Sequence, residues 1–312
     1  MNSLLDVKKL KVGFEGAKPV NVISEVSFSI QKGENLALVG ESGCGKSIIA
    51  HAILRLLAPE ARIEGSILFK GRELLKLSEK EMAKLRGNEL AIIFQNASHA
   101  LNPVYSIGRQ LAEPLRIHQK SGKTDATKKV LKALAQLGFF SPEKYLKFYP
   151  SWGSGGMNQR FLIASSTILE PELLIADEPS KGLDPARIKE VERELWVLGK
   201  EAKSSLLLIS HDLGFVRRLA DKIAVLYSGE IVELAKTSVF FKQPRHPYSQ
   251  GLLGSLPENG FVPIPGLAPA LCESPSGCRF HPRCPFQKEK CLREHPELKA
   301  RDGRAVRCFL WA

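Results

Sequence analysis

The chain has 312 residues, of which 44% are hydrophobic and 25% are charged. This is an ordinary globular composition, so it excludes a disordered or collagen-like chain, and the length corresponds to about two domains. The formal charge of +12 favours either anionic partners (nucleotide, nucleic acid or an anionic membrane surface) or a soluble basic surface. No apolar run reaches the ~18 residues that span a bilayer, and residues 1–10 lack the apolar core of a secretory signal. We therefore expect a cytoplasmic chain.

Short apolar runs predict the strands of a mostly parallel sheet, because uninterrupted runs are typical of strands buried on both faces. The runs are Leu36–Val39, Ala91–Phe94, Leu173–Ala176 and Leu206–Ile209. Ile223–Tyr227 and Ile231–Leu234 flank Ser228-Gly229-Glu230, which predicts a hairpin. Helical spacing between the runs indicates an α/β fold; the predicted helices include Ile48–Leu57, Asp125–Leu137 and Arg187–Lys200.

The first predicted strand runs directly into a glycine-rich loop that matches G-x-x-x-x-G-K-S. The loop reads Gly40-Glu41-Ser42-Gly43-Cys44-Gly45-Lys46-Ser47. Its glycines allow backbone N–H groups to point inward at phosphate oxygens. Lys46 then places its charge at the β- and γ-phosphates, and Ser47 offers a hydroxyl to Mg²⁺. The strand–loop–helix order predicts a nucleotide site.

Two carboxylates end another predicted strand. Asp177 and Glu178 directly follow Leu173–Ala176. Adjacent carboxylates at a strand end serve two roles beside bound nucleotide. We expect Asp177 to hold Mg²⁺, directly or through water, and Glu178 to face the γ-phosphate and act as general base.

Together with these motifs, five further features resemble the ATP-binding-cassette (ABC) ATPases over residues 5–240. Gln95 resembles the glutamine of the Q-loop, which senses Mg²⁺ and contacts the membrane subunit. Ser154-Gly155-Gly156 resembles the family signature, and Asp184 the D-loop aspartate. His211 resembles the switch histidine that contacts the γ-phosphate, and Phe14 the aromatic that stacks on adenine.

The resemblance implies an ATPase domain of residues 1–240. Its fold would combine a parallel-sheet core, an antiparallel β part and an α-helical subdomain at about residues 97–165. It also implies a shared site, in which ATP is held between the phosphate loop of one subunit and the signature of another. Here Gly153 stands where the family usually has Leu, and Met157 where Gln is usual. We expect weakened signature action on the partner's nucleotide, because an apolar anchor is lost and glycine loosens the backbone.

Composition changes after about residue 240, and we predict a smaller second unit at residues 241–312. It carries 11 basic and 6 acidic side chains. The segments Pro244-Arg245-His246-Pro247-Tyr248-Ser249 and Ser255-Leu256-Pro257 resemble the C-terminal extension of oligopeptide and dipeptide importer ATPases, a branch that includes nickel importers. A cysteine segment further on also resembles this branch, in which some members hold an iron–sulfur cluster.

The cysteines of this segment are spaced C-x5-C-x6-C-x16-C, at Cys278, Cys284, Cys291 and Cys308. Four thiolates are the usual ligands of a 4Fe–4S cluster and also bind Zn²⁺. These spacings are longer than the C-x2-C of zinc ribbons, which favours iron–sulfur. Zinc on the same four cysteines and free thiols stay open, and His281 is expected to be a surface histidine rather than a zinc ligand. Cys272 is expected to be a bystander.

The features favour an ATPase subunit of a membrane ABC importer for oligopeptides or dipeptides, with ATP and Mg²⁺ bound. The resemblance implies a peripheral protein at the cytoplasmic face of the cell membrane. Its partners would be two transmembrane permease subunits, an extracytoplasmic solute-binding protein and a related ABC ATPase subunit. For that pairing a heterodimer is favoured and a homodimer stays open.

The alternative is a non-transport ABC ATPase that acts on nucleic acid or ribosomes. The basic charge and an iron–sulfur segment are compatible with it. The single cassette and the His-Pro-Tyr segment oppose it, so no nucleic acid is expected. A catalytically degenerate subunit is opposed by Lys46, Ser47, Asp177, Glu178 and His211. The cargo stays open between peptide, nickel chelate and sugar.

Overall fold

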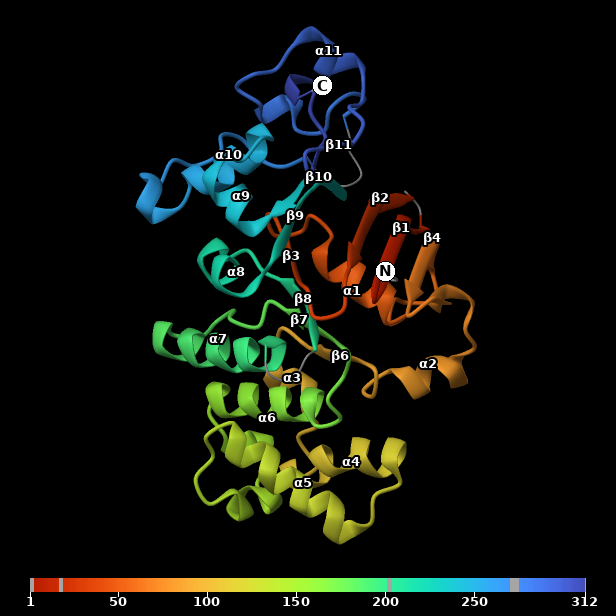
Figure 1. The fold of residues 1–312 in the computed structure, drawn as a ribbon, viewed down its shortest axis with the longest axis vertical. Coiled ribbons are helices and arrows are strands. Elements are labelled where there is room, and N and C mark those ends of the chain that lie inside the picture. Colours follow the sequence, from red (N-terminus) through yellow and green to blue (C-terminus); the bar gives the residue numbers. More distant parts are fainter. Residues whose placement is uncertain (1–2, 17–18, 201–203, 270–274, 312) are drawn as a thin grey trace. The chain divides into compact units, whose positions relative to one another are not determined.

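The computed structural model describes residues 3–16, 19–200, 204–269 and 275–311, so Cys272 lies outside the described residues. The chain divides into two compact units, residues 1–76 with 208–312 and residues 77–207. Each unit has its own strands and helices (Figure 1). In the part of the chain that the structure describes, no helix is long and apolar enough to cross a membrane.

A mixed sheet forms the centre of the first unit. Its main strands are β1 (Leu5–Phe14), β2 (Val20–Ile30), β3 (Asn35–Val39), β4 (Ala61–Phe69), β5 (Arg72–Glu73), β9 (Lys222–Tyr227) and β10 (Glu230–Lys236). They run in the order β5-β4-β1-β2-β10-β9-β3. β1, β2 and β4 are antiparallel neighbours that lie side by side in Figure 1, whereas β3 pairs parallel with β9. β9 and β10 form the predicted antiparallel hairpin.

The antiparallel strands bury alternating rather than continuous residues. In β1, Leu5, Val7 and Leu10 are buried. The alternation is interrupted at Lys8 and Lys9, where the register shifts and Lys9 has a φ of 48°. A bulge of this kind breaks the period-two pattern. Continuous apolar runs therefore indicate only the doubly buried strands, and the expectation of an antiparallel part came from the family resemblance.

The helix that follows the phosphate loop differs from its prediction. α1 spans Lys46–Ile53, whereas apolar spacing predicted a helix over Ile48–Leu57. Arg55 has a φ of 51°, a left-handed conformation that an α-helix does not contain. The helix therefore begins within the phosphate loop and ends before Leu57.

The C-terminal segment belongs to the same unit. Its β12 (Arg304–Val306) pairs with β10 through Glu233 and Val306, and with β11 (Lys299–Arg301). Contacts thus group this segment with the N-terminal strands, and the boundary between residues 240 and 241 stays a prediction. The remaining elements of the unit are η1 (Leu74–Lys76), α8 (Leu213–Leu219), α9 (Thr237–Lys242), α10 (Pro247–Gly254), η4 (Pro257–Asn259), η5 (His281–Arg283), α11 (Glu289–Arg293), β11 (Lys299–Arg301), β12 (Arg304–Val306) and η6 (Phe309–Trp311).

Parallel strands and a group of helices form the second unit. Its elements are α2 (Glu79–Leu85), β6 (Leu90–Ile93), α3 (Ala97–Ala100), α4 (Ile107–Gln119), α5 (Lys123–Gln136), η2 (Pro142–Lys147), η3 (Pro150–Trp152), α6 (Gly155–Thr167), β7 (Leu173–Asp177) and α7 (Pro185–Lys200). β6 and β7 are parallel neighbours. A further strand, β8 (Ser205–Ile209), lies across the division between the units. Every residue of β3, β7 and β8 is buried, as continuous apolar runs predict.

Helices α4, α5 and α6 lie together in Figure 1. Their buried side chains belong to a hydrophobic core that includes Phe139 and Phe161. Phe139 stacks on Phe161 with ring centroids 4.6 Å apart, and Tyr145 meets Phe139 edge-on at 4.8 Å. Both arrangements are favoured by the ring quadrupoles. The bounds of the helical subdomain stay a prediction. The buried members of this core are Leu101, Ile107, Leu111, Ala112, Leu115, Ala126, Val130, Leu134, Phe139, Phe161, Ala164 and Leu169.

Candidate functional site

The phosphate loop leaves the end of β3 and closes onto the first turn of α1. Gly40, Gly43 and Gly45 have φ values of 154°, 82° and 105°, which glycine adopts most easily. A Cβ on Gly40 would lie 2.2 Å from the carbonyl oxygen of Leu226. The glycines therefore allow both the curl of the loop and its close approach to β9.

The ammonium group of Lys46 lies inside the curved phosphate loop. Its Nζ donates to the carbonyl oxygens of Gly40 and Glu41 over 2.8 and 2.9 Å, and the side chain is buried. The loop also leads into the N-terminus of α1, where unpaired N–H groups and the helix dipole attract anions. The arrangement suits a phosphate group. Burial raises the pKa of the neighbouring Cys44 thiol, so this side chain brings no negative charge to the loop.

The loop is held by residues that the motifs did not indicate. Tyr248 accepts a hydrogen bond from the backbone N–H of Glu41, and Arg283 binds the Glu41 carboxylate. Tyr248 belongs to the His-Pro-Tyr segment and Arg283 lies between two of the clustered cysteines. Each segment stood out in the sequence, but no local pattern signals that either contacts a loop more than 200 residues away.

The second unit delivers two buried carboxylates at the end of β7. Asp177 and Glu178 are both less than 10% exposed. Glu178 has a φ of 48°, which is costly for a residue with a Cβ and is typical of functional sites. Gln95 follows β6, the parallel neighbour of β7. Because parallel strands end at one edge of a sheet, Gln95 emerges at the same edge as Asp177.

The signature residues begin α6. Ser154 is the N-cap, and its hydroxyl accepts a hydrogen bond from the N–H of Met157 over 3.3 Å. Ser154 and Gly155 are exposed, so this helix start is accessible to an anion. Gln159 donates to the carbonyl oxygen of Pro179 over 3.2 Å. The signature helix is thereby tied to the residue that follows Glu178.

The D-loop aspartate caps a helix. Asp184 is exposed, and its Oδ1 accepts from the N–H groups of Ala186 and Arg187 over 3.0 and 3.1 Å. Arg187 also packs on the signature, because a Cβ on Gly156 would lie 3.1 Å from its Nε. The start of α7 and the start of α6 are therefore in contact.

The predicted ATP-site residues fall into two groups, one in each unit. In the first unit His211 is exposed after β8, and Phe14 is half-buried at the end of β1. Their contacts with nucleotide stay predictions, as do the roles of the whole set. The first group is Phe14, Gly40, Glu41, Ser42, Gly43, Cys44, Gly45, Lys46, Ser47 and His211; the second is Gln95, Ser154, Gly155, Gly156, Asp177, Glu178 and Asp184.

The clustered cysteines line one pocket of the first unit, together with Phe280, Phe286 and Phe309. Burial, with a smaller contribution from the other thiols, raises the pKa of Cys278 to about 11. His281 lines the same pocket, and its Nδ1 lies 2.9 Å from the carbonyl oxygen of Cys278. The fold thus gathers Cys278, Cys284, Cys291 and Cys308, but the described residues contain no group of three or more His, Cys, Asp and Glu arranged to hold a metal ion.

Comparisons with known proteins match both parts of the chain. The ABC transporter family matches residues 23–181, and the oligopeptide/dipeptide transporter C-terminal region matches residues 232–291. A dipeptide transport ATP-binding protein of Bacillus subtilis is 43% identical, over 99% of this chain and 95% of the relative. An oligopeptide transport ATP-binding protein of the same organism is 41% identical over 100% and 98%, and a dipeptide transport ATP-binding protein of Escherichia coli is 38% identical over 98% and 96%.

Solved structures share the fold of the cassette. A dimeric ATP-binding cassette bound to ADP and Pi has a TM-score of 0.67 and 23% identity, over 75% of this chain and 98% of its own. The cbiO1 protein of Clostridium perfringens, part of an ABC transporter complex, has a TM-score of 0.65 and 24% identity, over 78% and 92%. At these identities the likeness establishes the fold alone.

Proposed function

Because this chain belongs to the ABC transporter family, we propose that it is the ATP-hydrolysing subunit of a membrane importer for oligopeptides or dipeptides. The observation that carries the proposal is full-length similarity: relatives named for peptide transport match 99%, 100% and 98% of the chain. The match includes the C-terminal region at residues 232–291. A match limited to the ATP-binding domain would indicate that the chain uses ATP, but it would not indicate which class of cargo is transported. These relatives support the importer over the non-transport ATPase that the basic charge left open.

In this proposal the phosphate loop binds the ATP phosphates. Its inward N–H groups and the start of α1 receive phosphate oxygens, and Lys46 turns from the loop carbonyls to the β- and γ-phosphates. The Ser47 hydroxyl and the Asp177 carboxylate would hold Mg²⁺, which prefers oxygen ligands of this kind. The metal supplies charge neutralisation at the phosphates.

Glu178 is assigned as general base. It accepts a proton from water while the water oxygen forms a bond to the γ-phosphorus, and the bond from that phosphorus to the bridging oxygen of ADP breaks. The burial of Glu178, directly after Asp177 at the end of β7, supports the assignment. Gln95 and His211 would contact Mg²⁺ and the γ-phosphate, and Phe14 would stack on adenine.

The signature acts on a second ATP-binding subunit. Ser154, Gly155 and Gly156 would face the γ-phosphate held by that partner, so that ATP draws the subunits together. We propose a heterodimer with a related ABC ATPase subunit, docked on two transmembrane permeases at the cytoplasmic face of the membrane. An extracytoplasmic solute-binding protein would deliver the cargo. The ATPase domain would comprise residues 1–240, with the extension at residues 241–312.

We further propose a 4Fe–4S cluster on the four clustered cysteines. The proposal rests on the donor chemistry, because four thiols from separate parts of the extension line one apolar-walled pocket. In the described residues these thiols are not arranged to hold a metal ion, so a cluster would have to draw them together. A bound cluster would supply a structural cross-link. The segment carries few large apolar side chains, and a metal cross-link can supply folding free energy where a core is small.

The proposal is tested by purifying the tagged chain from its native membrane and identifying its partners by mass spectrometry. We expect two permeases and a second ATPase. ATP hydrolysis of this complex in lipid nanodiscs should rise when the binding protein and a dipeptide or oligopeptide mixture are added. A ribosomal or nucleic-acid-bound preparation without permeases would contradict the proposal.

A further inference from the structure

The C-terminal extension binds two polar groups of Glu41 in the phosphate loop, the backbone N–H and the side-chain carboxylate. The backbone N–H of Glu41 donates to the Tyr248 hydroxyl over 2.9 Å, and the Glu41 carboxylate accepts from Arg283 over 2.8 and 2.9 Å. The remaining polar group, the carbonyl oxygen, accepts from Lys46. Glu41 thus connects the extension to the lysine that we assign to the phosphates.

Arg283 is itself rigidly placed. Its side chain is 5% exposed, against 31% for Glu41, and its Nε donates to the carbonyl oxygen of Pro265 over 2.9 Å. Two parallel hydrogen bonds from one guanidinium fix both the position and the direction of a carboxylate. An arginine guanidinium stays protonated at every ordinary pH, so the charge of Arg283 is permanent. Arg283 therefore restricts where Glu41 can lie.

Tyr248 is fixed by aromatic packing and by its helix. Its buried ring lies 4.6 Å from the Tyr227 ring and 5.4 Å from the Phe280 ring, measured between centroids. His246 caps the helix by accepting from the Tyr248 N–H over 3.1 Å. Burial lowers the pKa of His246 to about 3, so it stays neutral and remains an acceptor. These contacts fix the Tyr248 ring, and with it the position of the hydroxyl that accepts the hydrogen bond from Glu41.

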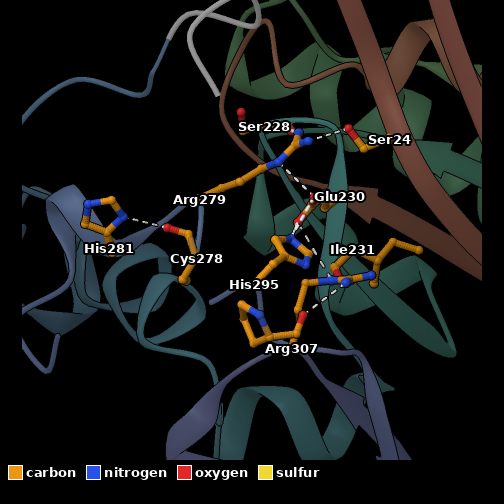
Figure 2. Close-up of polar contacts among 10 residues, drawn as sticks. Ser24, Ser228, Glu230, Ile231, Cys278, Arg279, His281, His295 and Arg307 are labelled. Atoms are coloured by element: carbon orange, nitrogen blue, oxygen red, sulfur yellow. Dashed lines mark hydrogen bonds and ion pairs between the residues drawn. The ribbon is translucent and has the colours of Figure 1, made fainter. Parts of the chain in front are cut away.

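A second arginine of the extension holds the hairpin turn between β9 and β10, which contacts the loop. Arg279 donates to the carbonyl oxygen of Ser228 and forms an ion pair with the buried Glu230 at 2.8 Å (Figure 2). Gly229, which lies between Ser228 and Glu230 in the chain, donates its N–H to the carbonyl oxygen of Cys44 over 3.1 Å. Figure 2 shows His295 and Arg307 converging on the same network. The hairpin turn behind the loop is therefore also fixed by the extension.

We propose that Arg283 and Tyr248 are positioning residues for ATP binding, which fix Glu41 and through it the phosphate loop. Neither residue contacts nucleotide in this assignment. A loop with several glycines loses much conformational entropy when it is ordered. If the extension orders the loop in advance, nucleotide binding no longer bears that cost. The inference rests on the proposed nucleotide role of the loop.

The test is a titration of the purified full chain with a fluorescent trinitrophenyl-ATP analogue in the presence of Mg²⁺. We expect Arg283→Met to raise the Kd about tenfold, which is the loss of one charge-assisted contact. Tyr248→Phe should raise it about threefold. The double variant Arg283→Met/Glu41→Gln should bind no more weakly than Arg283→Met alone, because the arginine acts through Glu41. At saturating ATP the hydrolysis rate should change less than the KM.

Arg293→Met is the matched control, since Arg293 forms an exposed ion pair with Glu289 in the same extension. It should leave the Kd unchanged. Wild-type affinity in Arg283→Met, equal weakening in Arg293→Met, or a double variant that binds more weakly than Arg283→Met alone would each overturn the inference. If Arg283→Met does not fold, Tyr248→Phe decides alone, because it loses only a hydroxyl. Wild-type binding that Lys46→Ala does not reduce would instead contradict the nucleotide role of the loop.

Discussion

The side-chain oxygen of Asn158 lies 2.8 Å from the point that a Cβ on Gly153 would occupy. Asn158 is buried, its Nδ2 donates to the carbonyl oxygen of Pro150 over 3.0 Å, and among the described residues its Oδ1 has no hydrogen-bond partner. Position 153 has glycine where the family usually has leucine. The Asn158 side chain lies in the space that a side chain at position 153 would enter.

We predict that restoring the family leucine by Gly153→Leu destabilises the chain. The new side chain must displace Asn158, whose hydrogen bond to Pro150 resists the movement. Such overpacking costs about 1–3 kcal/mol, and urea unfolding of the purified chain measures it.

Two further variants separate crowding from other causes. Gly155→Ala is the control, because no atom lies within 4 Å of its added Cβ. Gly153→Leu/Asn158→Ala should lose less stability than the sum of its single variants, since the collision is absent. Strict additivity would show that the two side chains do not compete for space.

Glu178→Gln should abolish ATP hydrolysis while ATP binding is kept. The amide has nearly the same shape as the carboxylate but cannot accept the proton of the attacking water. General bases contribute about 10²–10⁴-fold to such rates. Phosphate release and a nucleotide titration on the same preparation check both parts, and unchanged hydrolysis would reject Glu178 as the base.

Burial raises the pKa of Glu194 in α7 to about 7, from an ordinary value of 4.5. Between these values the folded chain binds more protons than the unfolded chain, so its stability falls as the pH rises through this window and levels off above it. Glu194→Gln removes the cost of charging a half-buried carboxylate. We expect it to stabilise the chain by about 1–3 kcal/mol at pH 8 and by little at pH 5.

Thermal unfolding at the two pH values measures this difference. Glu143→Gln, at an exposed position of the same unit, is the control and should show no such pH dependence. An equal effect of Glu194→Gln at pH 5 and pH 8 would mean that the carboxylate is already ionised at the lower value.

Anaerobic purification should yield about four iron and four acid-labile sulfide per chain, as one 4Fe–4S cluster requires. Cys284→Ser should lose both, whereas Cys44→Ser, which removes a buried cysteine of the phosphate loop, should retain both. Zinc without iron would make the pocket a structural zinc site, and the absence of both metals would contradict the cluster.

Local sequence was sufficient where function depends on neighbouring residues. A few consecutive residues were enough to predict three features: the phosphate loop, the carboxylates that end β7 and the serine that caps α6. Phosphate binding needs successive N–H groups, and a buried parallel strand needs a continuous apolar run. Features that depend on backbone geometry could not be predicted from the sequence pattern. The bulge at Lys9 interrupts the alternation that would have indicated β1, and the left-handed conformation of Arg55 ends α1 earlier than the apolar spacing predicted.

The sequence by itself determined the ATPase family, the doubly buried strands and the peptide-importer character of the C-terminal segment. Only the tertiary structure decided what that segment touches. Arg283 lies 242 residues from Glu41 along the chain, and an ion pair over that separation leaves no local pattern in either segment. It forms because β9, β10 and the cysteine segment fold against the phosphate loop, where the buried Arg283 guanidinium requires a hydrogen-bonded partner of opposite charge.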